Sequence, residues 1–302
     1  MKQFFLFIFC IAVLASCKNE KQIYKVSDKF KVGIVSDCQY CDCETNGLRN
    51  YRKSPGRLRD AVDRLNQENL DYTIHLGDFI DREFKSYDSL VPVWNDLQSQ
   101  KYHVLGNHDF QVADSLKPLV FSRMNLTENN RYYSFVVDKW RFIVLDGNDL
   151  SFHGSLSESK IRQRDSIFAE LAKDSVPYLK KWNGALSKAQ LKWVRTELDL
   201  AEKNKEKVGF YCHFPVYPLA GDNLWNREDL IHLISEYSCV KLFFNGHNHA
   251  GAYELVDGVH YLTFKAMVNT EDSSSFATAT FQKDSILIHG FGREASRIMP
   301  IH

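Results

Sequence analysis

The feature that most constrains the fold is a pattern repeated along the chain, in which a short apolar run ends in polar side chains. The run Tyr-His-Val-Leu at 102–105 is followed by Gly106 and then by Asn107, His108 and Asp109. Four other runs end in the same way, and the side chains that follow them are Asp37 with Gln39, Asp78, His213, and His247 with His249. Glycine lets the backbone turn sharply, and open α/β sheets place their sites at the carboxyl ends of their strands. We therefore expect these side chains to meet at one edge of a sheet.

Helical patterns alternate with the first strands. Ser54 and Pro55 indicate a helix start, with the serine as cap and the proline in the first turn, and an apolar stripe follows at 58–65. The next predicted elements are a strand at 72–76, a second apolar helical face at 90–97 and the strand at 102–105. This alternation predicts a parallel sheet with crossover helices.

The rest of the chain is richer in β-structure. The predicted elements are a hairpin at 132–145 that turns at Asp138 and Lys139, a helix at 157–172, a helix that begins at Ser187, a hairpin that turns at Asp257 and Gly258, and strands at 276–281 and 286–290. An Asp-Gly pair between alternating apolar runs is a strong hairpin signal, and Ser187 followed by Gln190 has the form of a capping box. Together these elements predict a mixed α/β (α+β) fold.

The composition is that of an ordinary globular protein, because 44% of the 302 residues are apolar and 25% are charged. Lysine plus arginine equal aspartate plus glutamate, at 38 each. A balanced charge gives no support for a nucleic-acid partner, so none is expected.

The N-terminus has the form of a bacterial lipoprotein signal. A basic start leads into a short apolar run and then into Leu-Ala-Ser-Cys at 14–17, which resembles a lipobox. Residues 1–16 are then the signal peptide, Cys17 is lipidated, 17–29 is a polar tether and 30–302 is a single folded domain. The protein would be a membrane-anchored lipoprotein on the periplasmic or cell-surface side of a bacterial membrane. Ordinary secretory cleavage and an uncleaved anchor are the alternatives.

Three cysteines, Cys38, Cys41 and Cys43, lie close together after the first strand. They could be misread as half of a zinc ribbon, but no second cysteine pair follows at the usual distance. Without Cys10 and Cys17 the chain has five cysteines, an odd number, so a full disulfide framework is not expected. We expect the three to be small packing residues near a strand end.

The polar side chains at the strand ends include a set of candidate metal ligands, which are Asp37, Gln39, Asp78, Asn107, His213, His247 and His249. Carboxylate, amide oxygen and imidazole together suit manganese, iron or zinc better than calcium, which takes only oxygen ligands. Seven candidates exceed what one ion of low coordination needs. They indicate two divalent ions that share one carboxylate.

The same blocks resemble the calcineurin-like metallophosphoesterases over roughly residues 30 to 290. The blocks are Asp-x-Gln at 37–39, Gly-Asp-x-x-Asp at 77–81, Gly-Asn-His-Asp at 106–109, the lone His213 and Gly-His-x-His at 246–249. The resemblance implies a metallophosphoesterase fold of two packed mixed β-sheets flanked by helices.

The resemblance also implies how the ligands are shared between the two ions. Asp78 would bridge both. The other ligands of one ion would be Asp37, Gln39 and His249, and those of the second ion would be Asn107, His213 and His247.

Gln39 departs from most of this family, which has Asp-x-His in the first block. The subgroup with Asp-x-Gln is the manganese-dependent ADP-ribose/CDP-alcohol diphosphatases, and the stretches at 182–184 and 213–218 look similar to that subgroup. An amide oxygen is a harder ligand than imidazole, so Mn²⁺ is favoured, with Fe or Zn as alternatives. The resemblance implies that a hydroxide held by the ions attacks the diphosphate bond of a nucleoside diphosphate-linked compound.

Further residues receive roles from this resemblance and from their positions. His108 would act beside the leaving oxygen as general acid or charge stabiliser, and Asp109 would orient its ring. The loop at 41–50 is shorter than in the subgroup and has no aromatic residue to stack on a nucleobase. The other candidates for substrate contact are the aromatic residues Tyr40, Phe110, Tyr217 and Trp225 and the cation Arg293.

Two other functions stay open at the level of sequence. One is a phosphomonoesterase or nucleotidase of the same fold, because the sequence does not reveal a site for a second phosphate. The other is a surface lipoprotein that binds a ligand without catalysis, and the complete ligand set argues against it. The sequence specifies neither the particular nucleotide-type substrate nor the oligomeric state.

Overall fold

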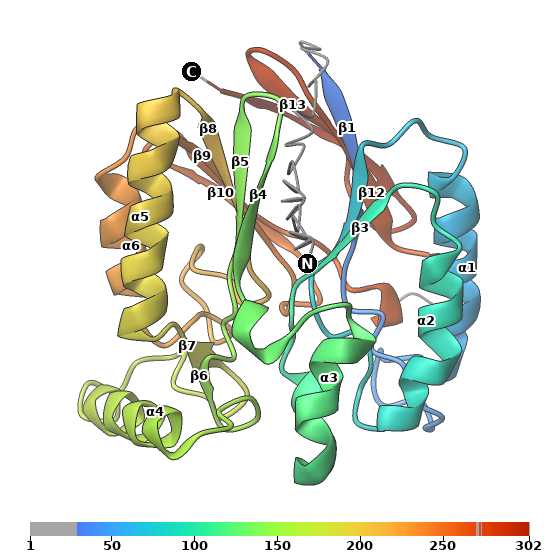
Figure 1. The fold of residues 1–302 in the computed structure, drawn as a ribbon. Helices are drawn as coiled ribbons and strands as arrows, with labels where there is room; N and C mark the ends of the chain where they lie inside the picture. Colours follow the sequence, from blue (N-terminus) through green and yellow to red (C-terminus); the bar gives the residue numbers. More distant parts are fainter. Residues whose placement is uncertain (1–28, 270–271, 273, 302) are drawn as a thin grey trace, which may run out of the picture.

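Two β-sheets packed face to face form the centre of the molecule, and helices cover their outer faces (Figure 1). The computed structural model describes residues 29–269, 272 and 274–301. The predicted signal peptide, Cys17 and all of the predicted tether except Lys29 lie outside these residues. No helix within the described ranges has the length and apolar character needed to cross a bilayer.

The first sheet has six strands in the order β14-β13-β12-β1-β2-β3. Their bounds are β1 Phe30–Val35, β2 Tyr72–His75, β3 Gln100–His103, β12 Phe276–Phe281, β13 Ser285–Phe291 and β14 Arg297–Pro300. β1, β2 and β3 are parallel, as the alternation of strands and helices predicted, and the other neighbouring pairs are antiparallel.

The second sheet has six strands in the order β10-β11-β9-β8-β5-β4. Their bounds are β4 Tyr133–Val137, β5 Trp140–Val144, β8 Lys207–Tyr211, β9 Val240–Asn245, β10 Ala252–Val256 and β11 Val259–Thr263. The central pairs are parallel, and the hairpins at the two edges are antiparallel. Both sheets are mixed, so the predicted fold class is confirmed.

Aromatic side chains fill the space between the sheets. Phe30 of the first sheet stacks on Phe281 at 4.5 Å and meets Phe142 of the second sheet edge to face at 6.0 Å. The hydroxyl groups of Tyr72 and Tyr211 join the two sheets through a buried hydrogen bond of 2.8 Å. Because large rings dominate the energy of a core and pack in preferred geometries, these contacts fix how the two sheets sit on each other.

Helices from three parts of the chain complete the layers. α1 Ser54–Leu65, α2 Tyr87–Asn95 and α3 Lys117–Arg123 pack on the first sheet's side, and α5 Lys188–Asn204 and α6 Arg227–Ser235 pack on the second sheet's side. α4 Glu158–Leu171 packs against the small sheet of β6 Leu150–Ser151 and β7 Gly184–Ala185. Short 3₁₀ helices occupy Tyr51–Lys53, Phe84–Ser86, His108–Phe110, Asp114–Leu116, Glu128–Asn130 and Met267–Asn269.

The predicted hairpin turns are confirmed by the backbone angles. Asp138, Asp257 and Gly258 have φ values of 54°, 48° and 79°, in the left-handed region that tight hairpin turns require. Both turns therefore lie where Asp-Lys and Asp-Gly were expected to reverse the chain.

The two predicted helix caps have different outcomes. Ser187 caps α5 as predicted, because its Oγ accepts a hydrogen bond of 3.2 Å from the backbone nitrogen of Gln190. The prediction for Ser54 is wrong. The 3₁₀ helix Tyr51–Lys53 runs directly into α1, so Ser54 already has helical angles, and within the described chain its side chain makes no capping bond.

The three clustered cysteines do not form a metal ribbon. Cys38 is buried, with its sulfur 3.6 Å from the sulfur of Met267, while Cys41 and Cys43 form a disulfide. The expectation of simple packing residues therefore holds for Cys38 and is wrong for the other two.

Candidate metal centre

The side chains predicted to bind metal follow the ends of β1, β2, β3, β8 and β9 and meet at one end of the two sheets. Four of them, Asp37, Gln39, Asp78 and His247, have left-handed backbones with φ values of 49°, 43°, 54° and 68°. Non-glycine residues seldom adopt this region, because it costs about 1–3 kcal/mol that the surrounding structure must offset. Such strain gathers at functional sites, and here it directs ligand side chains toward a common point.

Two glycines make room for these ligands. Gly77 has φ 100°, and a Cβ atom there would lie 2.5 Å from Nδ1 of His213. A Cβ atom at Gly106 would lie 2.1 Å from the backbone nitrogen of Asp78. The sequence predicted a sharp turn at Gly106, whereas the structure shows that close approach of the Asp78 backbone is what requires glycine there.

Four lone pairs converge at the first half of the centre. Nδ1–H of His213 donates to the carbonyl of Leu76 at 2.9 Å, and Nε2–H of His247 donates to Oδ1 of Asn183 at 2.8 Å. When each ring is neutral, as a metal ligand must be, its other nitrogen carries a lone pair, and these two atoms lie 3.1 Å apart. Oδ1 of Asn107 and Oδ2 of Asp78 lie 3.2 and 3.3 Å from Nε2 of His213. Acceptor atoms gathered this closely repel one another unless a cation lies between them.

Acceptor atoms also gather at the second half of the centre. Nε2 of Gln39 donates to Oδ1 of Asp81 at 2.9 Å, which fixes the amide so that its Oε1 is buried and, among the described residues, accepts no hydrogen bond. Nδ1–H of His249 donates to Oδ1 of Asn269 at 2.9 Å, leaving Nε2 3.7 Å from Oδ1 of Asp37. A buried acceptor without a donor is costly, so Gln39 is poised to bind an ion.

The carboxylates give the centre a strong preference for positive charge. Burial opposes a charge on His213, but Asp78 and Asp37 outweigh it and raise the pKa of His213 to about 9. Burial also opposes the charge of Asp78, yet His213 and His108 hold the pKa of Asp78 well below its ordinary value. Together with the converging lone pairs, this charge distribution fits divalent metal ions, and the mixture of ligand types suits Mn²⁺, Fe²⁺ or Zn²⁺.

The predicted partner of His108 is wrong. Nδ1 of His108 lies 3.1 Å from both Oδ1 and the carbonyl oxygen of Asp81, so Asp81 fixes the ring. Asp109 instead accepts hydrogen bonds of 2.9–3.3 Å from backbone nitrogens of Gly106 and of residues 78–80. Burial raises the pKa of Asp109 to about 7. Asp109 therefore ties the loops after β2 and β3 together beneath the centre.

A cleft of about 340 Å³ opens onto the centre. Besides five members of the predicted set, it is lined by residues that the sequence did not single out for substrate, which are Arg49, Gln111, Trp182 and Asp222. Trp182 is 47% exposed, and its indole hydrogen-bonds to the carboxyl group of Asp222. Its only signal in the sequence was its place in the stretch 182–184.

The five residues predicted to contact substrate do not line this cleft in the described part of the chain. Phe110 and Trp225 are fully buried and pack on Phe121 and on the rings beside α4. The others are Tyr40, which packs on the cluster under α1 and α2, Tyr217, which packs on Tyr261, and Arg293, which donates to the carbonyl of Ala266. Burial rules out substrate contact for Phe110 and Trp225. The side chains of Tyr40, Tyr217 and Arg293 are partly exposed, so their roles stay predictions.

The comparison with known protein families rests on most of the folded chain. Residues 30–251 match the calcineurin-like phosphoesterase family. The chain belongs to this family. All seven predicted metal ligands of this phosphoesterase lie within the matched residues.

This phosphoesterase has relatives that cover nearly its whole length. It is 32% identical to the manganese-dependent ADP-ribose/CDP-alcohol diphosphatase of Bos taurus, over 93% of this chain and 98% of that protein. The Homo sapiens protein of the same name is 31% identical over 89% and 92%. A solved dimetal phosphatase from Danio rerio has a TM-score of 0.81 at 28% identity, covering 90% of this chain and 99% of that one. The protein is therefore a metal-dependent hydrolase with a dinuclear phosphoesterase centre.

Proposed function

We propose that this phosphoesterase uses Mn²⁺ to cleave the diphosphate bond of nucleoside diphosphate-linked compounds of the ADP-ribose or CDP-alcohol type. The observation that carries the proposal is the cleft wall, where a cation, Arg49, and an exposed indole, Trp182, line the same cavity as the metal ligands. A second phosphate needs a positive partner and a nucleobase needs a flat apolar face. A phosphomonoester has no second phosphate for this cation to bind.

Arg49 is placed to meet a second phosphate. It is partly exposed at the cleft and close enough for its charge to act on both His108 and His249. Trp182 supplies the aromatic surface that the short 41–50 loop lacks. The names of the relatives, at about 30% identity, support the same substrate class, and Gln39 supports the preference for manganese.

In this proposal the residues of the chain have separate roles in the reaction. When bound, two divalent ions lower the pKa of water and clamp a phosphoryl oxygen. The ligand set positions those ions, and Asp81 holds His108 by Nδ1 so that Nε2 is the nitrogen available to the cleft. Burial disfavours the charged ring, but Asp78 and Asp81 raise the pKa of His108 above its ordinary value. His108 is thus suited to hold a proton for the leaving phosphate oxygen.

The substitution His108→Gln is expected to lower kcat for ADP-ribose by about 100- to 10,000-fold, because a positioned general acid contributes on that scale. KM should change little, since the ligands of the ions are intact. Steady-state kinetics at saturating Mn²⁺ measure both constants. The loss should shrink for a substrate with a phenol-type leaving group that departs without a proton, and a loss of equal size for both substrates would remove His108 as the acid.

The substrate proposal is tested by a panel of ADP-ribose, CDP-choline, bis-p-nitrophenyl phosphate and p-nitrophenyl phosphate, with metal-stripped protein reloaded with Mn²⁺. We expect nucleoside monophosphate from the two diphosphates. Arg49→Met should lower kcat/KM for them by about 10- to 100-fold, the size of a lost charge-assisted hydrogen bond, and should leave the single-phosphate diester almost unaffected. Arg52→Met is the matched control, because Arg52 pairs with Asp42 and Glu44 on the surface. Phosphate release from monoesters alone would make the protein a phosphatase or nucleotidase.

We also propose that the protein is anchored to a bacterial membrane by lipid on Cys17, on the periplasmic or cell-surface side. The support is the lipobox-like sequence at 14–17. An alkyne fatty acid fed to cells should label the wild type and leave Cys17→Ser unlabelled. Labelling of the serine variant would contradict the anchor.

A further inference from the structure

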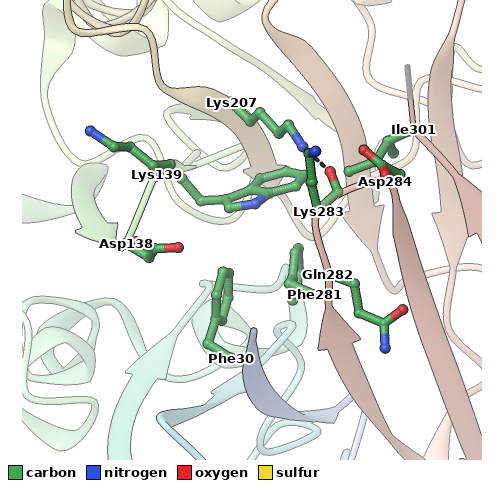
Figure 2. Close-up of a pocket in the computed structure, with 10 residues that line it drawn as sticks. Phe30, Asp138, Lys139, Lys207, Phe281, Gln282, Lys283, Asp284 and Ile301 are labelled. Atoms are coloured by element: carbon green, nitrogen blue, oxygen red, sulfur yellow. Dashed lines mark hydrogen bonds between the residues drawn. The ribbon is translucent and has the colours of Figure 1, made fainter. Parts of the chain in front are cut away.

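A second cavity, of about 500 Å³, lies where several strands begin. Its floor is made of three buried aromatic residues, Phe30 at the start of β1, Trp140 at the start of β5, and Phe281 at the end of β12. Figure 2 shows Phe30 and Phe281 side by side at the base of this cavity. Nothing in the proposed hydrolysis uses it.

Lysines surround this aromatic floor. Lys139, Lys207 and Lys283 line the cavity, and the exposed Lys29 directly precedes Phe30. Nζ of Lys207 donates to the carbonyl of Lys283, as Figure 2 shows, and lies 5.7 Å from the centre of the Trp140 ring. The acidic residues that line the cavity are Asp138 and Asp284. The cavity lining thus holds three lysines and two carboxylates, a net charge of +1, and Lys29 adds a further lysine beside it.

The cavity and the metal centre are at opposite ends of the sheets. β1 begins at Phe30 in the cavity and ends at Val35, two residues before Asp37. β8 likewise begins at Lys207 in the cavity and ends at Tyr211, two residues before His213. At about 3.3 Å per residue, strands of this length separate the two sites by roughly 20 Å. In Figure 1 this direction runs from the end of the molecule with the β1 label toward the end with β6, β7 and α4.

We propose that this lysine-ringed face docks on an anionic phospholipid bilayer, with the metal centre directed away from the membrane. Two observations select this partner. The positive face complements negative lipid headgroups, each lysine adding attraction that decays within a Debye length. The 28 residues that precede the described chain also join it at this face, next to Phe30. An anchor on that segment would hold this end of the molecule near the membrane.

Vesicle co-sedimentation tests the docking without the lipid anchor. Residues 29–302 contain both sheets and the clusters of buried side chains that join them, so this chain is suitable. It should bind phosphatidylcholine vesicles that contain phosphatidylglycerol, and bind pure phosphatidylcholine vesicles much less. Lys139→Gln with Lys283→Gln should weaken binding about 25-fold, at about fivefold for each charge removed. Both side chains are exposed, so neither change should unfold the protein.

The control variant is Lys188→Gln with Lys192→Gln, which removes two exposed charges near the start of α5, at the other end of the molecule. It should bind like the wild type, and all variants should keep their hydrolytic rate. Equal weakening by both pairs, or equal binding to both vesicle types, would overturn the proposal. Weaker vesicle binding by residues 18–302 than by residues 29–302 would also overturn the proposal, because the preceding segment would then occupy the face. A dimer that only the Lys139 and Lys283 changes dissociate would also overturn it, since the face would then join two copies.

Discussion

Replacing Asp78 by asparagine is expected to lower kcat/KM for a phosphodiester by about 1,000-fold or more and to reduce the manganese retained after gel filtration. Asp78 has one buried oxygen facing His213 at 3.3 Å, while its other oxygen accepts a hydrogen bond of 2.8 Å from the backbone nitrogen of His108. The amide that replaces it has the same shape but no charge, and only one oxygen. Losing a hydrogen-bond partner of a ligand already costs about 10- to 100-fold, and losing a shared ligand should cost more.

Asp222→Asn is the matched control for this change. Asp222 lines the same cleft, but its carboxyl group pairs with the indole of Trp182. We expect a change of less than about tenfold in kcat/KM and no loss of metal, because a hydrogen bond between these two groups is worth about 1–2 kcal/mol at most. If both variants lost activity and metal equally, Asp78 would have no special role and the assignment of a shared ligand would fail.

Replacing Arg131 by methionine is expected to destabilise the folded state by about 3–5 kcal/mol, the usual result of removing one partner from a buried ion pair. Nε of Arg131 donates to the buried carboxylate of Asp146, and its other nitrogens reach the carbonyls of Gly154 and Asn148 at 3.0 and 3.3 Å. One side chain therefore closes the loop that follows β5. Urea denaturation followed by circular dichroism measures the change.

The pH dependence of this variant identifies the cause. Burial already raises the pKa of Asp146 above its ordinary 3.8, and Arg131 opposes that rise. Without Arg131 the pKa rises further, so the folded state favours the protonated acid. The loss of stability relative to the wild type should then be smallest at low pH, where Asp146 is protonated in both proteins, and should grow as the pH rises from about 4 through the raised pKa. Adding Asp146→Asn should remove this dependence and recover part of the stability, while a pH-independent loss would point to packing alone.

The parts of the fold that were predictable are those that a few neighbouring residues determine. Strand and helix order followed from apolar periodicity, and the hairpin turns followed from Asp138 and Asp257, whose left-handed angles the local sequence favours. The gathering of the seven candidate ligands at one place was predictable because strand ends share an edge of the sheet. By contrast, no local signal showed that Ser54 continues a 3₁₀ helix and does not cap a new helix.

The cleft was predicted poorly because its walls come from separate loops. Arg49 and Trp182 reach one cavity only after both sheets have assembled. Arg49 had no periodic or motif signal, and Trp182 had only its place in the stretch 182–184. Phe110 directly follows a motif, yet both Phe110 and Trp225 are buried in the apolar core. Asp109 follows His108 in the sequence, but Asp81 reaches the ring because the loops after β2 and β3 fold together.

The left-handed backbone at Asp37, Gln39, Asp78 and His247 restricts how this centre can be re-engineered. A library that aims at a different metal would ordinarily vary ligand chemistry alone. Here every replacement must also tolerate a positive φ, which favours asparagine, aspartate and glycine and penalises β-branched side chains such as threonine. Selection for new metal specificity should therefore succeed first at Asn107, His213 and His249, where the backbone does not require a positive φ.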